Sequence, residues 1–203
     1  MPSLIPSKWV ENQHYTSLVP AQPTSAPPDK VEVVEVFWYG CPHCYHFDPF
    51  LEGWRTKGKP AFVDFARMPV IWSGNDVNRS HARLYYTLEA LGKLPTLHAE
   101  VFREIHQNGN PLVDPRDPAH TEQMQKEFLV KNGVAPADFD RTYRSFSVES
   151  KLQRAEQYTQ RYKVLGVPLM VVGGKYTADL GTAGGDTELL SLINDLAGAE
   201  HRR

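Results

Sequence analysis

The segment Cys41-Pro42-His43-Cys44 holds the only two cysteines of this 203-residue chain. It comes one residue after an apolar run, Val31 to Tyr39. Two thiols separated by two residues can close into a disulfide with each other and reopen. The spacing therefore indicates thiol-disulfide chemistry as the leading hypothesis.

The residues between the cysteines make the two thiols unequal. Pro42 has no N–H and a fixed φ, which suits the first position of a helix, so Cys41 is predicted at the N-cap. There its sulfur faces unpaired backbone N–H groups and the positive end of the helix dipole, which stabilise a thiolate. His43, when cationic, adds a further positive field. Cys41 is therefore the predicted nucleophile. Each unit by which its pKa falls below the working pH stabilises the dithiol form by about 1.4 kcal/mol, which raises the reduction potential of the pair by roughly 30 mV.

Cys44 is predicted on the opposite, inward side of the same helix. It continues an apolar stripe through Phe47, Leu51 and Trp54, at spacings of three and four residues. Cys44 is therefore the predicted resolving thiol.

Three other interpretations of the motif are open. A zinc site needs two further ligands, and the chain has no second pair of cysteines and no histidine pair at a suitable spacing. A purely structural disulfide would close a very short loop and remove little entropy from the unfolded chain. The pair could also occur by chance in a reduced cytosolic protein. We expect no metal and no cofactor other than the Cys41-Cys44 disulfide itself.

Composition limits the class of protein. A chain with 41% hydrophobic residues can bury the core of one compact domain, or of one domain carrying an insertion. A net charge of −2 gives no reason to expect nucleic acid as a partner. No apolar stretch approaches the roughly 20 residues that span a bilayer. The segment Met1 to Val10 lacks the basic and apolar regions of a secretory signal, so we expect either a cytosolic chain or one whose signal has been removed.

Strand-like patterns occupy the two ends of the chain. Apolar or alternating runs predict strands over His14–Val19, Val31–Tyr39, Ala61–Met68, Leu169–Val172 and Lys175–Ala178. Gly173-Gly174 between the last two is a hairpin signal. A final helix, capped by Asp186 or Thr187, is expected to turn an apolar stripe to the sheet.

A block of helices lies between these ends, from about Asp76 to Tyr162, where the apolar period becomes 3.6. The first three helices are expected to stop at glycines, namely Gly92, Gly109 and Gly133. Pro136 opens a fourth helix, with Phe139, Tyr143 and Phe146 on one face. A long fifth helix runs from Val148 to Tyr162.

This order resembles that of DsbA-type thiol-disulfide oxidoreductases of the thioredoxin superfamily. The likeness is carried by Glu35 to Gly40 leading into Cys41-Pro42-His43-Cys44, and by Gly166-Val167-Pro168 followed by the hairpin to Tyr176. It implies an α/β protein, a thioredoxin fold with an inserted all-helical domain. The expected division is a discontinuous thioredoxin-like domain, residues 1–75 and 163–203, and a helical domain, residues 76–162.

The resemblance also implies roles for single residues. Cys41 matches the exposed nucleophile of the family and Cys44 its buried partner. Pro168 matches a cis-proline expected to lie against the disulfide, and the Val167 peptide is expected to pair with an extended substrate segment. Pro42 is the second predicted substrate-contacting residue.

Glu35 matches a buried acid of the family, which could exchange a proton with Cys44 because a buried acid must be protonated or partnered. An edge position with a solvated side chain is the alternative. Asp48 is expected to be an exposed carboxylate. Phe65, Ala66 and Arg67 occupy the region in which some members carry a lysine partner, so that lysine is not placed and the question of a charged partner for Glu35 stays open.

The function implied is a thiol:disulfide oxidase that donates its disulfide to reduced or unfolded secreted proteins. The resemblance assigns reoxidation to a membrane-bound, quinone-linked partner of the DsbB type. We expect a monomer in the bacterial periplasm, because an oxidising disulfide has little use in a reducing cytosol. A thiol reductase or disulfide isomerase is one alternative, and a thioredoxin-fold binding module or chaperone with an idle disulfide is another.

Overall fold

The computed structural model describes residues 4–203, which form two compact units. The first, here called the sheet unit, comprises residues 4–37 with His46–Met68 and Arg161–Arg203. The second, the helical unit, comprises Trp38–Tyr45 and Pro69–Gln160. The motif with the two cysteines therefore belongs to the helical unit. The domain boundaries expected from the sequence, 1–75 with 163–203 and 76–162, stay a prediction.

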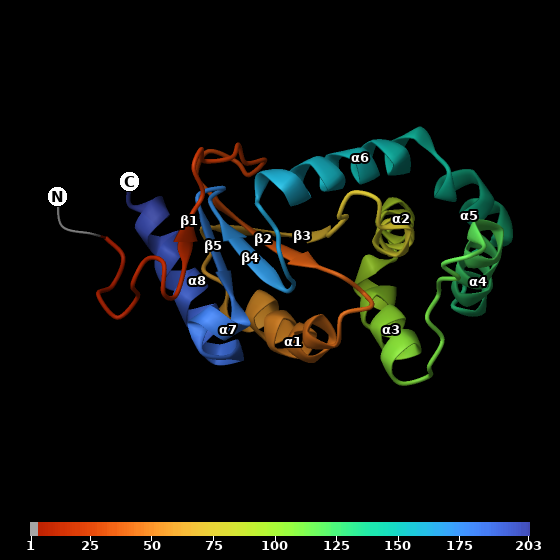
Figure 1. Cartoon of the computed structure of the whole chain (residues 1–203), viewed down its shortest axis with the longest axis horizontal. Helices are drawn as coiled ribbons and strands as arrows, with labels where there is room; N and C mark the ends of the chain where they lie inside the picture. The colour runs from red at the N-terminus through yellow and green to blue at the C-terminus, as the bar shows by residue number, and fades with distance from the viewer. Residues whose placement is uncertain (1–3) are drawn as a thin grey trace. The chain divides into compact units, whose positions relative to one another are not determined.

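Five strands make one sheet in the sheet unit (Figure 1). They are β1 (Thr16–Ser17), β2 (Val31–Phe37), β3 (Val63–Pro69), β4 (Leu169–Val172) and β5 (Tyr176–Asp179), in the order β1-β5-β4-β2-β3. β4 pairs antiparallel with both β2 and β5. Every residue of β2 is buried, as expected for an apolar run in an interior strand. The predicted first strand, His14–Val19, is shortened to two residues.

The turn between β4 and β5 requires glycine. Gly173 and Gly174 have φ values of 58° and 64°, a conformation that L side chains rarely adopt. A Cβ on Gly174 would also lie 2.1 Å from the carbonyl oxygen of Gln22. The hairpin prediction is confirmed, although β5 begins at Tyr176 because Lys175 lies in the turn.

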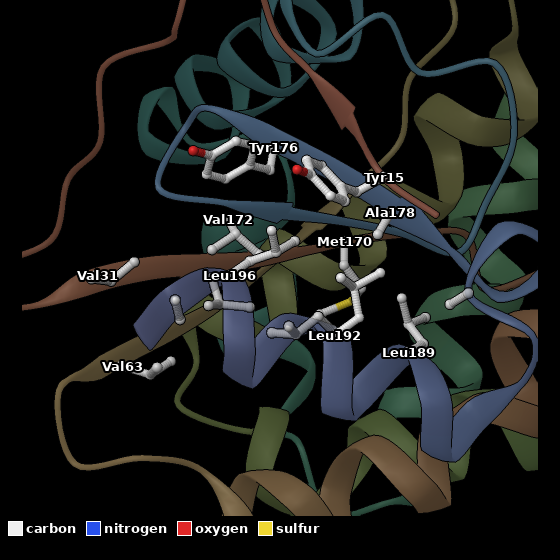
Figure 2. Close-up of a cluster of buried hydrophobic side chains, with 14 of the residues drawn as sticks. Tyr15, Val31, Val63, Met170, Val172, Tyr176, Ala178, Leu189, Leu192 and Leu196 are labelled. Carbon is white, nitrogen blue, oxygen red and sulfur yellow. The ribbon is translucent and has the colours of Figure 1, made fainter. Parts of the chain in front are cut away.

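The core of the sheet unit lies between the sheet and α8 (Asp186–His201). Figure 2 shows the leucine side chains of α8 pointing toward strand residues such as Met170 and Val172. Leu189, Leu192 and Leu196 have no exposed surface. The predicted cap was wrong, because Gly185 and not Asp186 or Thr187 precedes the first turn of α8. A short helix before it, α7 (Leu180–Ala183), was not predicted because four residues are too few to show a period.

The helix that follows the first cysteine, α1 (Pro42–Gly53), contributes residues to both units. Its later turns carry Phe47 and Leu51 into the core of the sheet unit, as the apolar spacing predicts. A five-residue π-helix, Trp54–Gly58, continues the chain. The indole of Trp54 donates to Asn194 Oδ1 of α8 at 2.9 Å, which ties this end of the segment to the core.

The helical unit contains the five predicted helices. They are α2 (Asp76–Ala90), α3 (Leu94–His106), α4 (Pro118–Lys131), α5 (Pro136–Tyr143) and α6 (Phe146–Arg161). Positive φ values at the predicted stop signals, Gly92, Gly109 and Gly133, confirm that left-handed residues follow the first three. Phe146 was wrongly placed on the fourth helix. It begins α6 and is 88% exposed, because α5 ends one turn earlier.

A largely buried arginine joins three elements of the sheet unit. Arg67 of β3 donates to Glu35 Oε2 of β2 at 2.8 Å, and to Asp48 Oδ1 and Glu52 Oε1 of α1 at 3.0 and 2.7 Å. Glu35 and Asp48 are 1% and 6% exposed, so Asp48 is not the surface carboxylate that was expected. Glu35 has the charged partner that sequence reasoning did not identify.

The three carboxylates respond differently to this arginine. Burial raises the pKa of Glu35 to about 7, although Arg67 opposes the rise. Burial also acts on Glu52, but hydrogen bonds from Arg55 and Arg67 outweigh it and lower its pKa to about 2. Arg67 therefore holds α1 against β2 and β3, because its single positive charge is shared by three carboxyl groups from α1 and β2.

We predict that Arg67→Met destabilises the protein by about 3–5 kcal/mol near neutral pH, because it leaves buried carboxylates without their partner. A carboxyl whose pKa is raised in the folded state lowers the stability of the protein as the pH rises through that pKa. Without Arg67, which opposes the rise, the pKa of Glu35 will be higher still. The difference in unfolding free energy between wild type and variant should therefore shrink as the pH falls from about 8 to about 5, because Glu35 becomes protonated. Urea unfolding at several pH values measures it.

Arg55→Met is the matched control. Arg55 pairs with Glu52 on the same helix, but its side chain is 42% exposed, so its loss should cost only about 0–1 kcal/mol. Equal losses in the two variants, or a loss from Arg67→Met that grows as the pH falls, would contradict the assignment.

Candidate active site

The first cysteine lies where the helix start was predicted. α1 begins at Pro42, and the Tyr45 N–H donates to the Cys41 carbonyl oxygen at 3.1 Å, which is the first helical hydrogen bond. Cys41 keeps 7% of its surface exposed and Cys44 keeps none. Pro42 and His43 are exposed. Both cysteines are thus buried, unlike the exposed nucleophile that the resemblance implied, and only the one at the helix N-terminus keeps any exposed surface.

The thiol of Cys41 is acidic. A hydrogen bond from the Cys44 side chain lowers its pKa most; burial opposes this, and hydrogen bonds from the backbone of Cys44 and His43 and the charge of His43 lower it further, to about 6. The predicted contributions of the helix N-terminus and of His43 are both present. The largest one, from Cys44, was not predicted, because it depends on how two side chains of one helical turn face each other.

The residues before Cys41 form a tight turn. The Cys41 N–H donates to the Trp38 carbonyl oxygen at 3.0 Å. A Cβ on Gly40 would lie 2.4 Å from Cζ2 of Trp38, so the indole ring lies directly on Gly40. A glycine at this position lets the ring fold back over the turn that leads to Cys41.

Three histidines of the helical unit hold the chain on either side of the cysteine motif. Trp38 Nε1 donates to His81 Nδ1 of α2 at 2.8 Å. The Tyr39 hydroxyl lies 2.8 Å from His98 Nδ1 of α3. His106 Nε2, also of α3, donates to the Tyr39 carbonyl oxygen at 2.7 Å, since a carbonyl can only accept.

The last of these histidines also contacts the residue that follows the motif. The His106 ring stacks on Tyr45 with centroids 4.8 Å apart, and Gln107 donates to the Tyr45 hydroxyl. None of the three histidines was predicted as a site residue. Their positions on the inward face of a helix were the one available signal.

The predicted proline loop lies in the sheet unit. The Val167–Pro168 peptide bond is cis, as the resemblance implied, and Pro168 is buried. Val167 is half-buried, and Leu169 starts β4, opposite Val36 of β2. The predicted contact of Pro168 with the disulfide and the predicted proton exchange between Glu35 and Cys44 stay predictions. Glu35 itself lies in the buried strand β2 and not at an edge.

Among residues 4–203, no group of three or more His, Cys, Asp or Glu side chains is arranged to hold a metal ion. None of the helices in the same range is both long enough and apolar enough to cross a bilayer.

Comparison with known proteins agrees with this geometry. The family described as DSBA-like thioredoxin domain matches residues 63–188. The thiol:disulfide interchange protein DsbA of Azotobacter vinelandii is 40% identical over 194 residues, which cover 96% of this chain and 86% of that protein. The protein of the same name from Pseudomonas aeruginosa strain PAO1 is 39% identical over 188 residues, covering 93% and 84%.

Solved structures give the same result. The crystal structure of Pseudomonas aeruginosa DsbA has a TM-score of 0.85 and 37% identity, covering 96% of this chain and 95% of that one. That of the oxidoreductase DsbA from Xylella fastidiosa has a TM-score of 0.82 and 28% identity, covering 94% and 96%. With a thioredoxin fold, a helical insertion and an acidic cysteine at a helix N-terminus, this chain belongs to the DsbA family of thiol:disulfide interchange proteins.

Proposed function

We propose that this protein is a thiol:disulfide oxidase, which donates the Cys41-Cys44 disulfide to folding substrate proteins. The observation that carries the proposal is the low pKa of Cys41, about 6. A thiolate that is stable at neutral pH stabilises the dithiol form of the pair, which makes the disulfide form a stronger oxidant. It also makes Cys41 a good leaving group when substrate is released.

The reaction moves two electrons from two substrate thiols to the protein. A substrate thiolate attacks Sγ of Cys41 in the disulfide form, the Cys41–Cys44 bond breaks, and Cys44 leaves as a thiolate. A second substrate thiolate then attacks the substrate sulfur of the mixed disulfide. Cys41 leaves as its stable thiolate, the substrate keeps the new disulfide, and Cys44 takes up a proton.

Other residues are assigned supporting roles. Glu35 is proposed to exchange the proton of Cys44, and a pKa of about 7 lets a carboxyl both hold and release a proton near neutral pH. Val167 is proposed to pair with an extended substrate through its backbone, next to Pro168. Pro42 and His43, both exposed beside Cys41, are positioned to meet the incoming substrate.

The oxidase needs reoxidation after each turnover. We propose that a membrane-bound, quinone-linked protein of the DsbB type accepts the two electrons from the Cys41-Cys44 dithiol. The proposed substrates are reduced or unfolded secreted proteins, and the proposed location is the bacterial periplasm, where disulfides persist. The protein is proposed to act there as a monomer, with no cofactor beyond its own disulfide.

Trapping tests which thiol attacks. Cys44→Ala should accumulate mixed disulfides with substrate proteins that are supplied with their disulfide intact. The Cys41 thiolate attacks that disulfide, one substrate sulfur leaves as a thiolate, and the second thiol that would release the complex is missing. Cys41→Ser should accumulate none, since Cys44 has no exposed surface. Non-reducing electrophoresis after acid quenching measures both. Equal trapping by the two variants would overturn the assigned roles.

The direction of exchange is tested by the reduction potential of the Cys41-Cys44 pair. Equilibration with glutathione buffers, followed by alkylation of the remaining thiols, should give a value well above the roughly −180 mV of protein disulfide isomerase. A value near the roughly −270 mV of thioredoxin would show a reductase instead.

The pH dependence of alkylation tests the acidity of Cys41. In the reduced protein the rate should rise through a midpoint near pH 6, well below the pKa of about 8.5 of an ordinary cysteine. His43→Ser should move the midpoint upward, because the positive charge that stabilises the thiolate is lost. His46→Ser, an exposed histidine of the same helix that lies 3.7 Å from Asp186, is the control and should move it less. A wild-type midpoint near 8.5 would contradict the site.

A further inference from the structure

His81 of α2 is buried, and both of its ring nitrogens are engaged. An indole N–H can only donate, so His81 Nδ1 must accept the hydrogen bond from Trp38 Nε1 at 2.8 Å. The ring proton is therefore on Nε2, which donates to the Pro111 carbonyl oxygen at 2.8 Å. The side chain is a connector that accepts on one side and donates on the other.

Only the neutral ring can make this connection. A proton on Nδ1 would face the indole N–H, donor against donor. Burial lowers the pKa of His81 to about 4, so the connecting form is the one present at neutral pH. His81 is 3% exposed, and substrate or solvent has little access to it.

From Trp38 the connection continues to the nucleophile. The indole lies on Gly40, and the Trp38 carbonyl accepts from the Cys41 N–H at 3.0 Å. The orientation of the ring and the shape of the turn that ends at Cys41 are thus coupled. That turn also directs the Cys41 sulfur toward the backbone of His43 and Cys44, whose hydrogen bonds stabilise the thiolate.

We propose that His81 is a positioning residue for the disulfide reaction: through the Trp38 indole it holds the Cys41 turn and so sets the acidity and the redox poise of Cys41. The helical unit then acts on the chemistry through a histidine that touches neither cysteine. This inference rests on the proposed function for its biological meaning. The measurements on Cys41 themselves do not depend on the direction of exchange.

Two substitutions separate the two hydrogen bonds of His81. Glutamine carries its amide nitrogen about where histidine carries Nε2, so His81→Gln can keep the bond to Pro111 and loses the acceptor for Trp38. Asparagine carries its amide oxygen about where histidine carries Nδ1, so His81→Asn can keep the acceptor for Trp38 and loses the bond to Pro111. Both changes replace a buried imidazole by an amide of smaller size.

We expect these two variants to differ in the pKa of Cys41. Thiolate absorbance of the reduced full-length protein, recorded as a function of pH, measures this pKa. His81→Gln should raise the pKa and make the disulfide less oxidising, with the glutathione equilibrium constant falling roughly threefold for about half a unit of pKa. His81→Asn should shift both by clearly less. Trp38→Phe removes the indole N–H that donates to His81 and should raise the pKa of Cys41 as His81→Gln does. It provides the same test if His81→Gln does not fold.

A double-mutant cycle closes the test. If the Trp38–His81 hydrogen bond carries the effect, Trp38→Phe and His81→Gln together should raise the pKa of Cys41 no more than either alone. Additive shifts, equal shifts from His81→Gln and His81→Asn, or no shift from Trp38→Phe would overturn the proposal. His120→Gln, the same change at an exposed histidine of the helical unit, is the control and should leave Cys41 unchanged.

These outcomes are distinct from failure of the proposed function. A wild-type reduction potential near that of thioredoxin would refute the oxidase while leaving the comparison of variants intact. Conversely, the wild-type pair could prove oxidising while none of the three substitutions changes the pKa of Cys41. That result would support the oxidase and refute the role of His81.

Discussion

The proposed chemistry of this protein depends on the hydrogen bonds that meet the Cys41 sulfur at the first turn of α1. The Cys44 side chain contributes most, and the backbone of Cys44 and His43 adds to it. Proline fixes the starting point of the helix locally, and these donors reach the sulfur only while the helix begins at Pro42. The remaining structure keeps this short segment in place. A helix start that frayed or shifted by one residue would aim the amides away from the sulfur and return the thiol toward an ordinary pKa.

Two kinds of interaction hold α1 and the chain that enters it. Within the sheet unit, Phe47 and Leu51 are buried in the core, and Arg67 pairs with carboxylates of the helix and of β2. Within the helical unit, histidines bind the residues that flank the motif, at Trp38, Tyr39 and Tyr45. The apolar contacts supply stability, whereas the buried charges and hydrogen bonds specify one geometry at an energetic cost in desolvation. Both kinds of interaction are needed, because the reactivity of Cys41 depends on how its sulfur is oriented toward the hydrogen-bond donors of the first turn.

Local patterns predicted much of the architecture, and their failures have a common cause. The start of α1, the hairpin at Gly173-Gly174 and the helical block were predicted correctly, because each depends on residues within about one turn of one another. Phe146 was assigned to the wrong helix because a period of 3.6 continues smoothly across the break between α5 and α6. Asp48 was assigned to the surface because its partner, Arg67, comes from another element.

The sequence by itself determined the family, because the motif at Cys41 and Cys44 and the order of the elements around it can be recognised from local patterns. It also located the start of the helix at Pro42, so the backbone contribution to the acidity of Cys41 is a local property of these residues. Tertiary structure decided what surrounds them. Arg67 and Glu35 are 32 residues apart in the chain, and Trp38 and His81 are 43 apart. No local pattern encodes such pairs, because burial that makes a hydrogen bond or an ion pair obligatory exists only after the chain has folded.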